Sequence, residues 1–161
     1  MSKNLTTGVT PELDGIGRRI ALICARWNDV IVNRLENGAR EALVNAGVAE
    51  DDIVSIKVPG ALEIPIAMRA ALATGTFDAA IALGVVLRGD TYHFEVVSNE
   101  SASGVMRVGL DSGRVVTNGI LTVDTEAQAD ERSVGGPGNK GAEAAAAALE
   151  LLAVCEQLAA H

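Results

Sequence analysis

The segment from residue 84 to residue 94 holds residue types that could act on a small phosphorylated molecule. An apolar run ending at Leu87 leads into the short polar sequence RGDT (88–91), and His93 follows where a helix is expected to begin. Free backbone N–H groups at a helix start bind anions such as phosphate. A histidine beside them exchanges protons near neutral pH. The alternative is a structural histidine satisfied by a backbone carbonyl, and the sequence leaves both interpretations open.

Two further side chains with chemical potential follow predicted strands. Trp27, which precedes Asn28, is either packed in the core or placed at the rim, where its face could stack on a planar heterocycle. Glu63 stands at an expected helix start, where the helix dipole favours a carboxylate, and it could also accept hydrogen bonds from ligand hydroxyls. Gly60 and Ala61 leave the neighbouring backbone open to close contact.

Three polar residues in the second half of the chain have the same two kinds of interpretation. Arg132 is either a surface arginine or a phosphate clamp, which its planar guanidinium would suit. Asn118 interrupts an apolar run and is either a satisfied core amide or part of a pocket lining. Residues 136–141 match the pattern G-x-G-x-x-G, but they follow a helix instead of a strand, so we reject a dinucleotide site. Lys140, at the end of this connection, could still reach a polar ligand edge.

Alternating strands and helices must position these residues. Apolar runs predict strands at 19–25, 53–58, 79–87 and 115–121. Caps and breakers predict helices at 29–46, from 65 to about 75, at 91–111, at 125–132, and from 139 or 140 to the C-terminus. This order predicts an α/β fold, a four-stranded parallel sheet flanked by helices on both faces. Ligands bind beyond the carboxyl ends of such strands, where Trp27 and residues 59–63 and 88–93 fall.

Composition narrows the class of protein. The 161 residues suit one domain, which we place at 18–161 after a flexible N-terminal tail at 1–17. The net charge of −8 argues against a nucleic-acid partner, and no apolar run is long enough for a membrane span. Cys24 and Cys155 lack metal-ligand spacing and are expected to be small core residues. The tail has no apolar signal segment, so we expect a cytoplasmic protein.

Four segments together resemble the lumazine synthase family, which makes 6,7-dimethyl-8-ribityllumazine in riboflavin biosynthesis. They are ARWN (25–28), VPGALEIP (58–65), the segment 84–94 and NKGAEA (139–144), and their order and spacing are specific. The resemblance implies an enzyme that condenses 5-amino-6-(D-ribitylamino)uracil with 3,4-dihydroxy-2-butanone 4-phosphate. An imine forms, phosphate leaves, the ring closes and water is lost, and no metal or organic cofactor is needed. Two alternatives stay open: a non-catalytic flavin- or lumazine-binding protein, and a shell-forming homologue.

The resemblance also assigns roles to residues. His93 would be the catalytic acid and base. The pyrimidine and ribityl chain would be bound by Trp27, Asn28, Gly60, Ala61, Leu62, Glu63, Val85, Val86, Leu87, Asn118 and Lys140. The phosphate would be bound by Gly89, Asp90, Thr91 and Arg132. Asn118 would come from the adjacent subunit, at a position where some family members carry phenylalanine.

The family fold is flavodoxin-like, and its active sites lie between neighbouring subunits of a homopentamer. Some members assemble twelve pentamers into an icosahedral shell of 60 subunits, and the short connection from Arg132 to Lys140 permits such a shell here. Riboflavin synthase is a further partner that the resemblance suggests.

Overall fold

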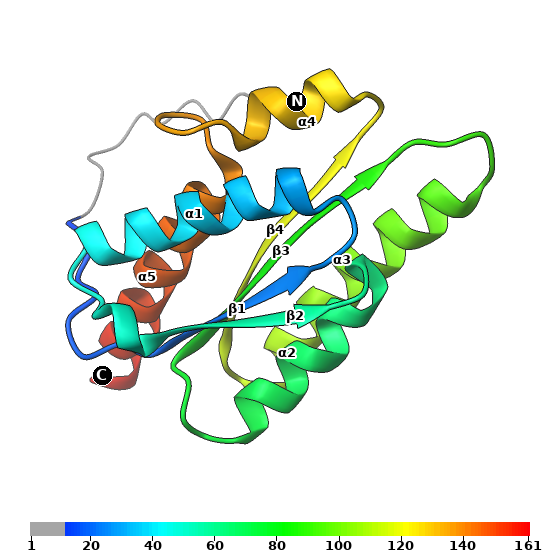
Figure 1. Cartoon of the computed structure of the whole chain (residues 1–161). Helices are drawn as coiled ribbons and strands as arrows, with labels where there is room; N and C mark the ends of the chain where they lie inside the picture. The colour runs from blue at the N-terminus through cyan, green and yellow to red at the C-terminus, as the bar shows by residue number, and fades with distance from the viewer. Residues whose placement is uncertain (1–11) are drawn as a thin grey trace.

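A parallel four-stranded sheet forms the middle layer of the protein in a computed structural model, which describes residues 12–161 (Figure 1). The strands are β1 (Ile20–Ala25), β2 (Ile53–Val58), β3 (Ala79–Leu87) and β4 (Val115–Val123). The helices are α1 (Asp29–Asn45), α2 (Ile64–Ala73), α3 (His93–Ser112), α4 (Glu126–Ser133) and α5 (Lys140–Ala159), with short 3₁₀ turns at Glu50–Asp52 and Ala61–Glu63. Most of the expected N-terminal tail, residues 1–11, lies outside the described residues.

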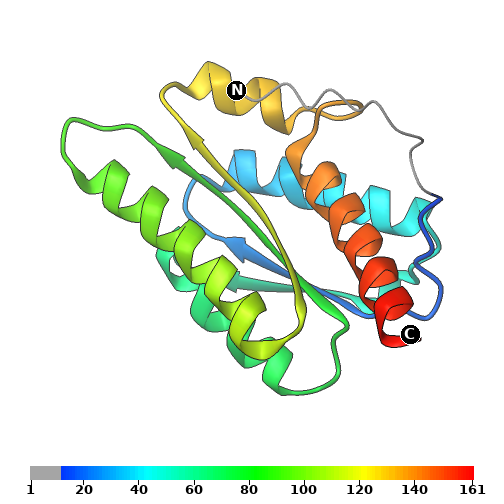
Figure 2. The same ribbon diagram turned by 180° about the vertical axis from the view of Figure 1, so that it is seen from behind.

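The strand order β2-β1-β3-β4, with all neighbours parallel, confirms the predicted three-layer, flavodoxin-like α/β fold. Helices α1, α4 and α5 cover one face and α2 and α3 the other, as the two opposite views show (Figures 1 and 2). The central strands β1 and β3 are buried almost throughout, which explains their unbroken apolar sequences. The edge strands β2 and β4 contain partly and fully exposed positions as well as buried ones.

Helices α1 and α5 lie very close together because glycines stand where they cross. A Cβ on Gly141 would overlap the carbonyl of Leu35, and one on Gly38 would overlap the side chain of Asn139. The alanine-rich sequence of α5 therefore has a packing reason: this helix buries Ala144, Ala145 and Ala148 against the sheet and α1.

Two details differ from the sequence-based expectations. Strand β4 runs to Val123 instead of ending at Leu121, because it stays paired with β3 through the partners Leu87 and Val123. Cys155 is exposed, whereas Cys24 is buried. The core expectation for Cys155 was wrong because α5 continues past the sheet, and every residue after Leu152 is exposed within this chain. Burial, which is the largest influence, raises the pKa of the Cys24 thiol to about 12.

Among residues 12–161, no helix combines the length and apolar character needed to cross a membrane.

Candidate active site

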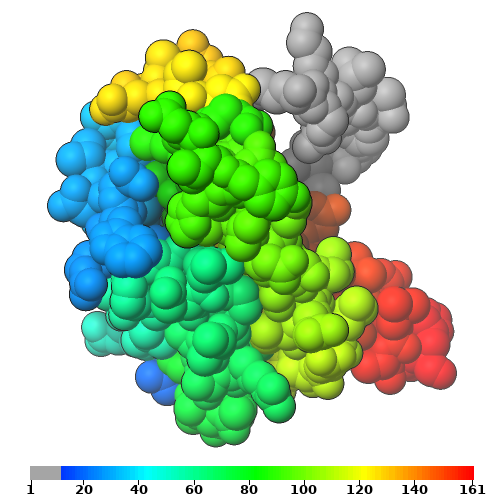
Figure 3. All heavy atoms as spheres, turned by 90° about the vertical axis from the view of Figure 1, so that its right-hand side faces the viewer, coloured from blue at the N-terminus to red at the C-terminus, as the bar shows by residue number. Residues whose placement is uncertain are grey.

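The segments that follow the strands gather at one end of the sheet. Figure 3 looks onto this end, where the start of α1 (blue), the α2 region and α3 (greens) and α4 (yellow) lie beside one another. The chain leaves β1 and β3 toward opposite sides of the sheet, and such a switch point opens a crevice for ligands.

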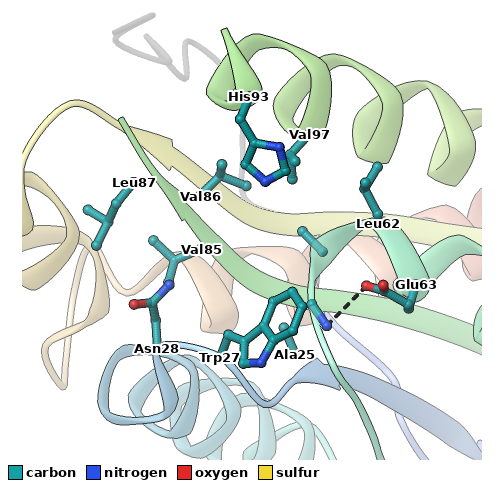
Figure 4. Close-up of a pocket in the computed structure, with 12 residues that line it drawn as sticks. Ala25, Trp27, Asn28, Leu62, Glu63, Val85, Val86, Leu87, His93 and Val97 are labelled. Atoms are coloured by element: carbon teal, nitrogen blue, oxygen red, sulfur yellow. Dashed lines mark hydrogen bonds between the residues drawn. The ribbon is translucent and has the colours of Figure 1, made fainter. Parts of the chain in front are cut away.

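A hollow of about 370 Å³ occupies this crevice, and we call it the first hollow (Figure 4). Its lining residues are Ala25, Trp27, Asn28, Gly60, Ala61, Leu62, Glu63, Val85, Val86, Leu87, His93 and Val97. All the residues expected to bind the heterocycle, except Asn118 and Lys140, therefore lie together with His93. Ala25 and Val97 are additional lining residues, and their ordinary apolar positions gave no signal in the sequence.

Trp27 stands at the rim instead of in the core, with 61% of its surface exposed. Its loop is fastened to the neighbouring connection, since the backbone N–H of Trp27 donates to the Pro59 carbonyl at 3.0 Å. The indole rests on Gly60, where a Cβ would lie 2.5 Å from the indole Cε3. One ring face is thus supported by backbone, and the ring borders the hollow where a planar ligand could stack on it.

Glu63 lies beside Gly60 and Trp27 in the lining of the first hollow, directly before α2 (Figure 4). Its Oε2 accepts a hydrogen bond from the Gly60 backbone N–H at 3.1 Å, which fixes the carboxylate against the 60–63 turn. A carboxylate held in this way keeps further lone pairs that can accept hydrogen bonds from ligand hydroxyls.

His93 is the first residue of α3, and its imidazole points into the first hollow from the wall opposite Trp27 (Figure 4). Its backbone N–H donates to Oγ1 of Thr91 at 3.4 Å. Among residues 12–161 no backbone carbonyl accepts a hydrogen bond from the ring nitrogens, so within this part of the chain the imidazole is directed at the hollow. The ring is placed to exchange protons with a molecule bound in the hollow.

The expected phosphate-binding residues 89–91 form an exposed turn between β3 and α3. A Cβ on Gly89 would meet no atom within 4 Å, so the turn has open space on that side. The turn lines neither hollow within this chain, and its phosphate role stays a prediction.

A second hollow, of about 490 Å³, lies along the edge strand β4. It is lined by Thr117, Asn118, Gly119, Ile120, Leu121, Arg132, Lys140, Glu143, Ala144 and Ala147. It shares no lining residue with the first hollow and is separately built on β4, α4 and α5. The structure therefore does not bring Asn118, Arg132 and Lys140 to the other expected site residues of the same chain.

The polar groups of the second hollow are held by neighbours in the chain. Arg132 donates to the Gln128 carbonyl at 2.9 Å, and Lys140 pairs with Glu143 at 2.7 Å. Asn118 is exposed, and its Oδ1 accepts from the Ile120 backbone N–H at 2.9 Å. The interpretation of Asn118 as a core amide is thus wrong, because β4 is an edge strand.

The side chain of Asn139 stabilises the connection between Arg132 and Lys140. Its buried side chain donates to the carbonyls of Ser133 (2.9 Å), Val134 (3.1 Å) and Arg34 (3.2 Å), and its Oδ1 accepts from the Ala142 N–H. The sequence identified Asn139 only as a possible helix cap. Its role in fixing the whole turn was missed, because these partners come from three separate segments.

Arg88, the first residue after β3, links the start of α3 to the end of β4. Its guanidinium pairs with Asp124 and Glu95, and hydrogen bonds to these carboxylates raise the pKa of Arg88 above its usual range. The hydrogen bond from Arg88 correspondingly lowers the pKa of Glu95. The sequence gave Arg88 no role of its own.

The described residues contain no cluster of three or more His, Cys, Asp or Glu side chains that could hold a metal ion.

Comparison with known proteins connects this geometry to a reaction. Residues 17–156 match the sequence model of a family described as 6,7-dimethyl-8-ribityllumazine synthase. The chain is 50% identical over 141 residues to the 6,7-dimethyl-8-ribityllumazine synthase of Gemmatimonas aurantiaca, covering 88% of this chain and 86% of the relative. The enzymes of the same name from Cupriavidus metallidurans and Ralstonia pickettii are 48% and 46% identical over 140 residues, covering 87% of this chain and 80% and 82% of theirs.

Proposed function

This chain belongs to the 6,7-dimethyl-8-ribityllumazine synthase family, and from that premise we propose how its two hollows carry out the reaction. The protein is a transferase of riboflavin biosynthesis. It condenses 5-amino-6-(D-ribitylamino)uracil with 3,4-dihydroxy-2-butanone 4-phosphate to 6,7-dimethyl-8-ribityllumazine, and it releases phosphate and water.

We assign the pyrimidine and its ribityl chain to the first hollow. Trp27 stacks on the ring, while the strand end at Val85–Leu87 offers apolar and backbone contacts. Residues 60–62 and the carboxylate of Glu63 hold the ribityl hydroxyls. His93 lies where it can move protons as the imine forms and the ring closes.

We assign the phosphate to two segments that meet only across a subunit boundary. The turn of Gly89, Asp90 and Thr91 offers backbone N–H groups beside the first hollow. Arg132 of an adjacent subunit supplies the positive charge, and its neighbours Asn118 and Lys140 reach the heterocycle from the same side. The observation that carries this proposal is the division of the expected site residues between two hollows with no common lining.

Alignment supplies more of the rate in this proposal than proton transfer does. Holding two reactants in position can lower a barrier by about 7–11 kcal/mol. General acid–base catalysis contributes roughly 10²–10⁴-fold. We expect the family reaction to proceed here without a metal or organic cofactor.

We propose a homopentamer as the unit that completes these sites, with a shell of twelve pentamers as the larger assembly. Large apolar side chains on α2 and α3 support self-association, since Ile66, Met106 and Leu110 are 74%, 62% and 76% exposed in the single chain. Riboflavin synthase is the partner we propose for the interior of such a shell. Two unbonded cysteines agree with a cytoplasmic location.

Mixing the pure protein with both substrates tests the activity. We expect the lumazine, followed by its absorbance, and inorganic phosphate to form in equal molar amounts. Neither product should form when the pyrimidine is omitted. Binding of the lumazine without turnover would instead identify a non-catalytic homologue. A solution mass measured in the same sample tests the assembly, because a fully active monomer would contradict a site shared between subunits.

A further inference from the structure

The side chain of Arg88 is held by three groups, two from α3 and one from the connection between β4 and α4. Its Nε donates to Oδ1 of Asp124 at 2.6 Å, and its Nη1 donates to Oε1 of Glu95. The guanidinium carbon also lies 4.2 Å from the centroid of the Phe94 ring. The backbone contributes as well, because the Arg88 N–H donates to the Val123 carbonyl at 3.0 Å and continues the pairing of β3 with β4. Arg88 is therefore fixed at the point where β3 ends.

On one side, these contacts fix the start of α3. Phe94 and Glu95 directly follow His93 in the first turn of that helix. The turn 88–92 spans from Arg88 to the same helix start, so the Arg88 guanidinium closes the turn at its base. The turn itself has few other fixed points: Thr91 bonds the His93 N–H, Gly89 faces open space, and Tyr92 is 73% exposed.

On the other side, the contacts lead to α4. The backbone N–H of Asp124 donates to Oε1 of Gln128 at 2.8 Å, and the Gln128 carbonyl accepts from Arg132 at 2.9 Å. A series of hydrogen-bonded residues thus runs from Glu95 through Arg88, Asp124 and Gln128 to Arg132, and Asp124 and Gln128 each use the side chain for one contact and the backbone for the other. The two ends of this series are the helix start that carries His93 and the guanidinium assigned to phosphate.

We propose that Arg88 is a positioning residue for the phosphate-bearing substrate, a role that rests on the proposed function. It holds the 89–91 turn and, through Asp124 and Gln128, the guanidinium of Arg132. In a site shared between subunits, one Arg88 sets the phosphate turn of one active site and the arginine of the next. Arg88 itself touches neither hollow.

The exposure of this network makes its role measurable. The side chains of Arg88, Glu95 and Asp124 are 45%, 33% and 60% exposed, and exposed ion pairs contribute little to folding stability. Variants should therefore fold and assemble. A misplaced phosphate turn, in contrast, can lower the efficiency of catalysis by up to about 100-fold.

The experiment is steady-state kinetics on Arg88→Gln, with each substrate varied in turn. We expect KM for 3,4-dihydroxy-2-butanone 4-phosphate to rise by about 10- to 100-fold, while KM for the pyrimidine stays within about twofold. Arg88→Lys should fall between the wild type and Arg88→Gln, because an ammonium can pair with one carboxylate but lacks the planar fork that holds both.

Arg18→Gln is the matched control. Arg18 pairs with Glu156 through two nitrogens, but it lies just before β1, at the opposite end of the sheet. Removing this pair should leave both KM values unchanged. If Arg88→Gln has a normal KM for the phosphate substrate, or raises both KM values equally, the positioning role is wrong. Arg132→Ala separates the two proposals: a normal phosphate KM in that variant contradicts the shared phosphate site, whatever Arg88→Gln does.

Discussion

The first and second hollows of this chain differ in chemistry as much as in place. The first is built from strand ends in the middle of the sheet and presents an indole, a carboxylate and an imidazole. The second lies along the edge strand β4 and presents a guanidinium together with an ammonium that pairs with the Glu143 carboxylate. A planar ring suits the first, and an anion suits the second. In the arrangement we propose, each chain carries two unlike halves of a site, so a complete site would need neighbouring subunits.

The largest effect that we predict concerns the first hollow. His93→Ala should lower kcat by about 10²–10⁴-fold, because a proton must then move without a positioned acid or base. Measurable turnover should remain, since alignment of the substrates is kept. His161→Ala, at the exposed chain end, is the control for loss of a histidine. Complete loss of turnover with intact binding of both substrates would show that proton transfer outweighs alignment.

The counterpart in the second hollow is Arg132→Ala. We expect KM for the phosphate substrate to rise by about 10- to 100-fold, which corresponds to the loss of charge-assisted hydrogen bonds. KM for the pyrimidine should change little. Steady-state kinetics with each substrate varied measures both KM values. An equal rise in the two would contradict the assignment of the phosphate to Arg132 and of the pyrimidine to the first hollow.

A smaller effect with the opposite selectivity is expected from Gly60→Ala. The added Cβ would lie 2.5 Å from Cε3 of Trp27, so the indole must shift. The shift would disturb the surface on which the pyrimidine is proposed to stack. KM for the pyrimidine should rise by about tenfold, and KM for the phosphate substrate should not. Gly135→Ala, which adds a methyl group to open space, is the matched control. A normal pyrimidine KM in Gly60→Ala would argue against stacking on Trp27.

The first hollow was largely predictable from sequence, and the second was not. Trp27, Glu63 and His93 stand in the connections that follow apolar runs, and parallel strands bring such connections to one edge of the sheet. No local pattern shows that Asn118 lies on an exposed edge, because strand order depends on long-range pairing. The same holds for Asn139, whose partners Arg34 and Ser133 are close only in the fold. The resemblance to a family placed Asn118 in the adjacent subunit, which periodicity alone did not do.

The smallest predicted effect concerns the pH dependence of folding stability at Glu36, a residue that lines neither hollow. Burial alone would raise the pKa of Glu36, but hydrogen bonds from Lys57 and Ser55 outweigh it and lower the pKa. The resulting stabilisation is present above the usual pKa of 4.5 and is lost as pH falls through the lowered value. The free energy of unfolding, measured with urea, should therefore fall less on acidification in Glu36→Gln than in the wild type.

Glu41→Gln, on the exposed side of the same helix, provides the comparison for this pH effect. Neither variant should alter KM for either substrate at neutral pH. An identical acid response in Glu36→Gln and the wild type would contradict the assigned role of the Lys57 and Ser55 contacts.

The most direct test of the central claim is complementation between subunits that lack different halves. His93→Ala and Arg132→Ala chains are unfolded together, refolded as a mixed assembly and assayed with both substrates. If each active site takes His93 from one subunit and Arg132 from the next, random mixing regenerates about a quarter of the sites in intact form. Activity should then recover toward about a quarter of the wild-type value. No gain over the separately refolded variants would contradict a site shared between subunits.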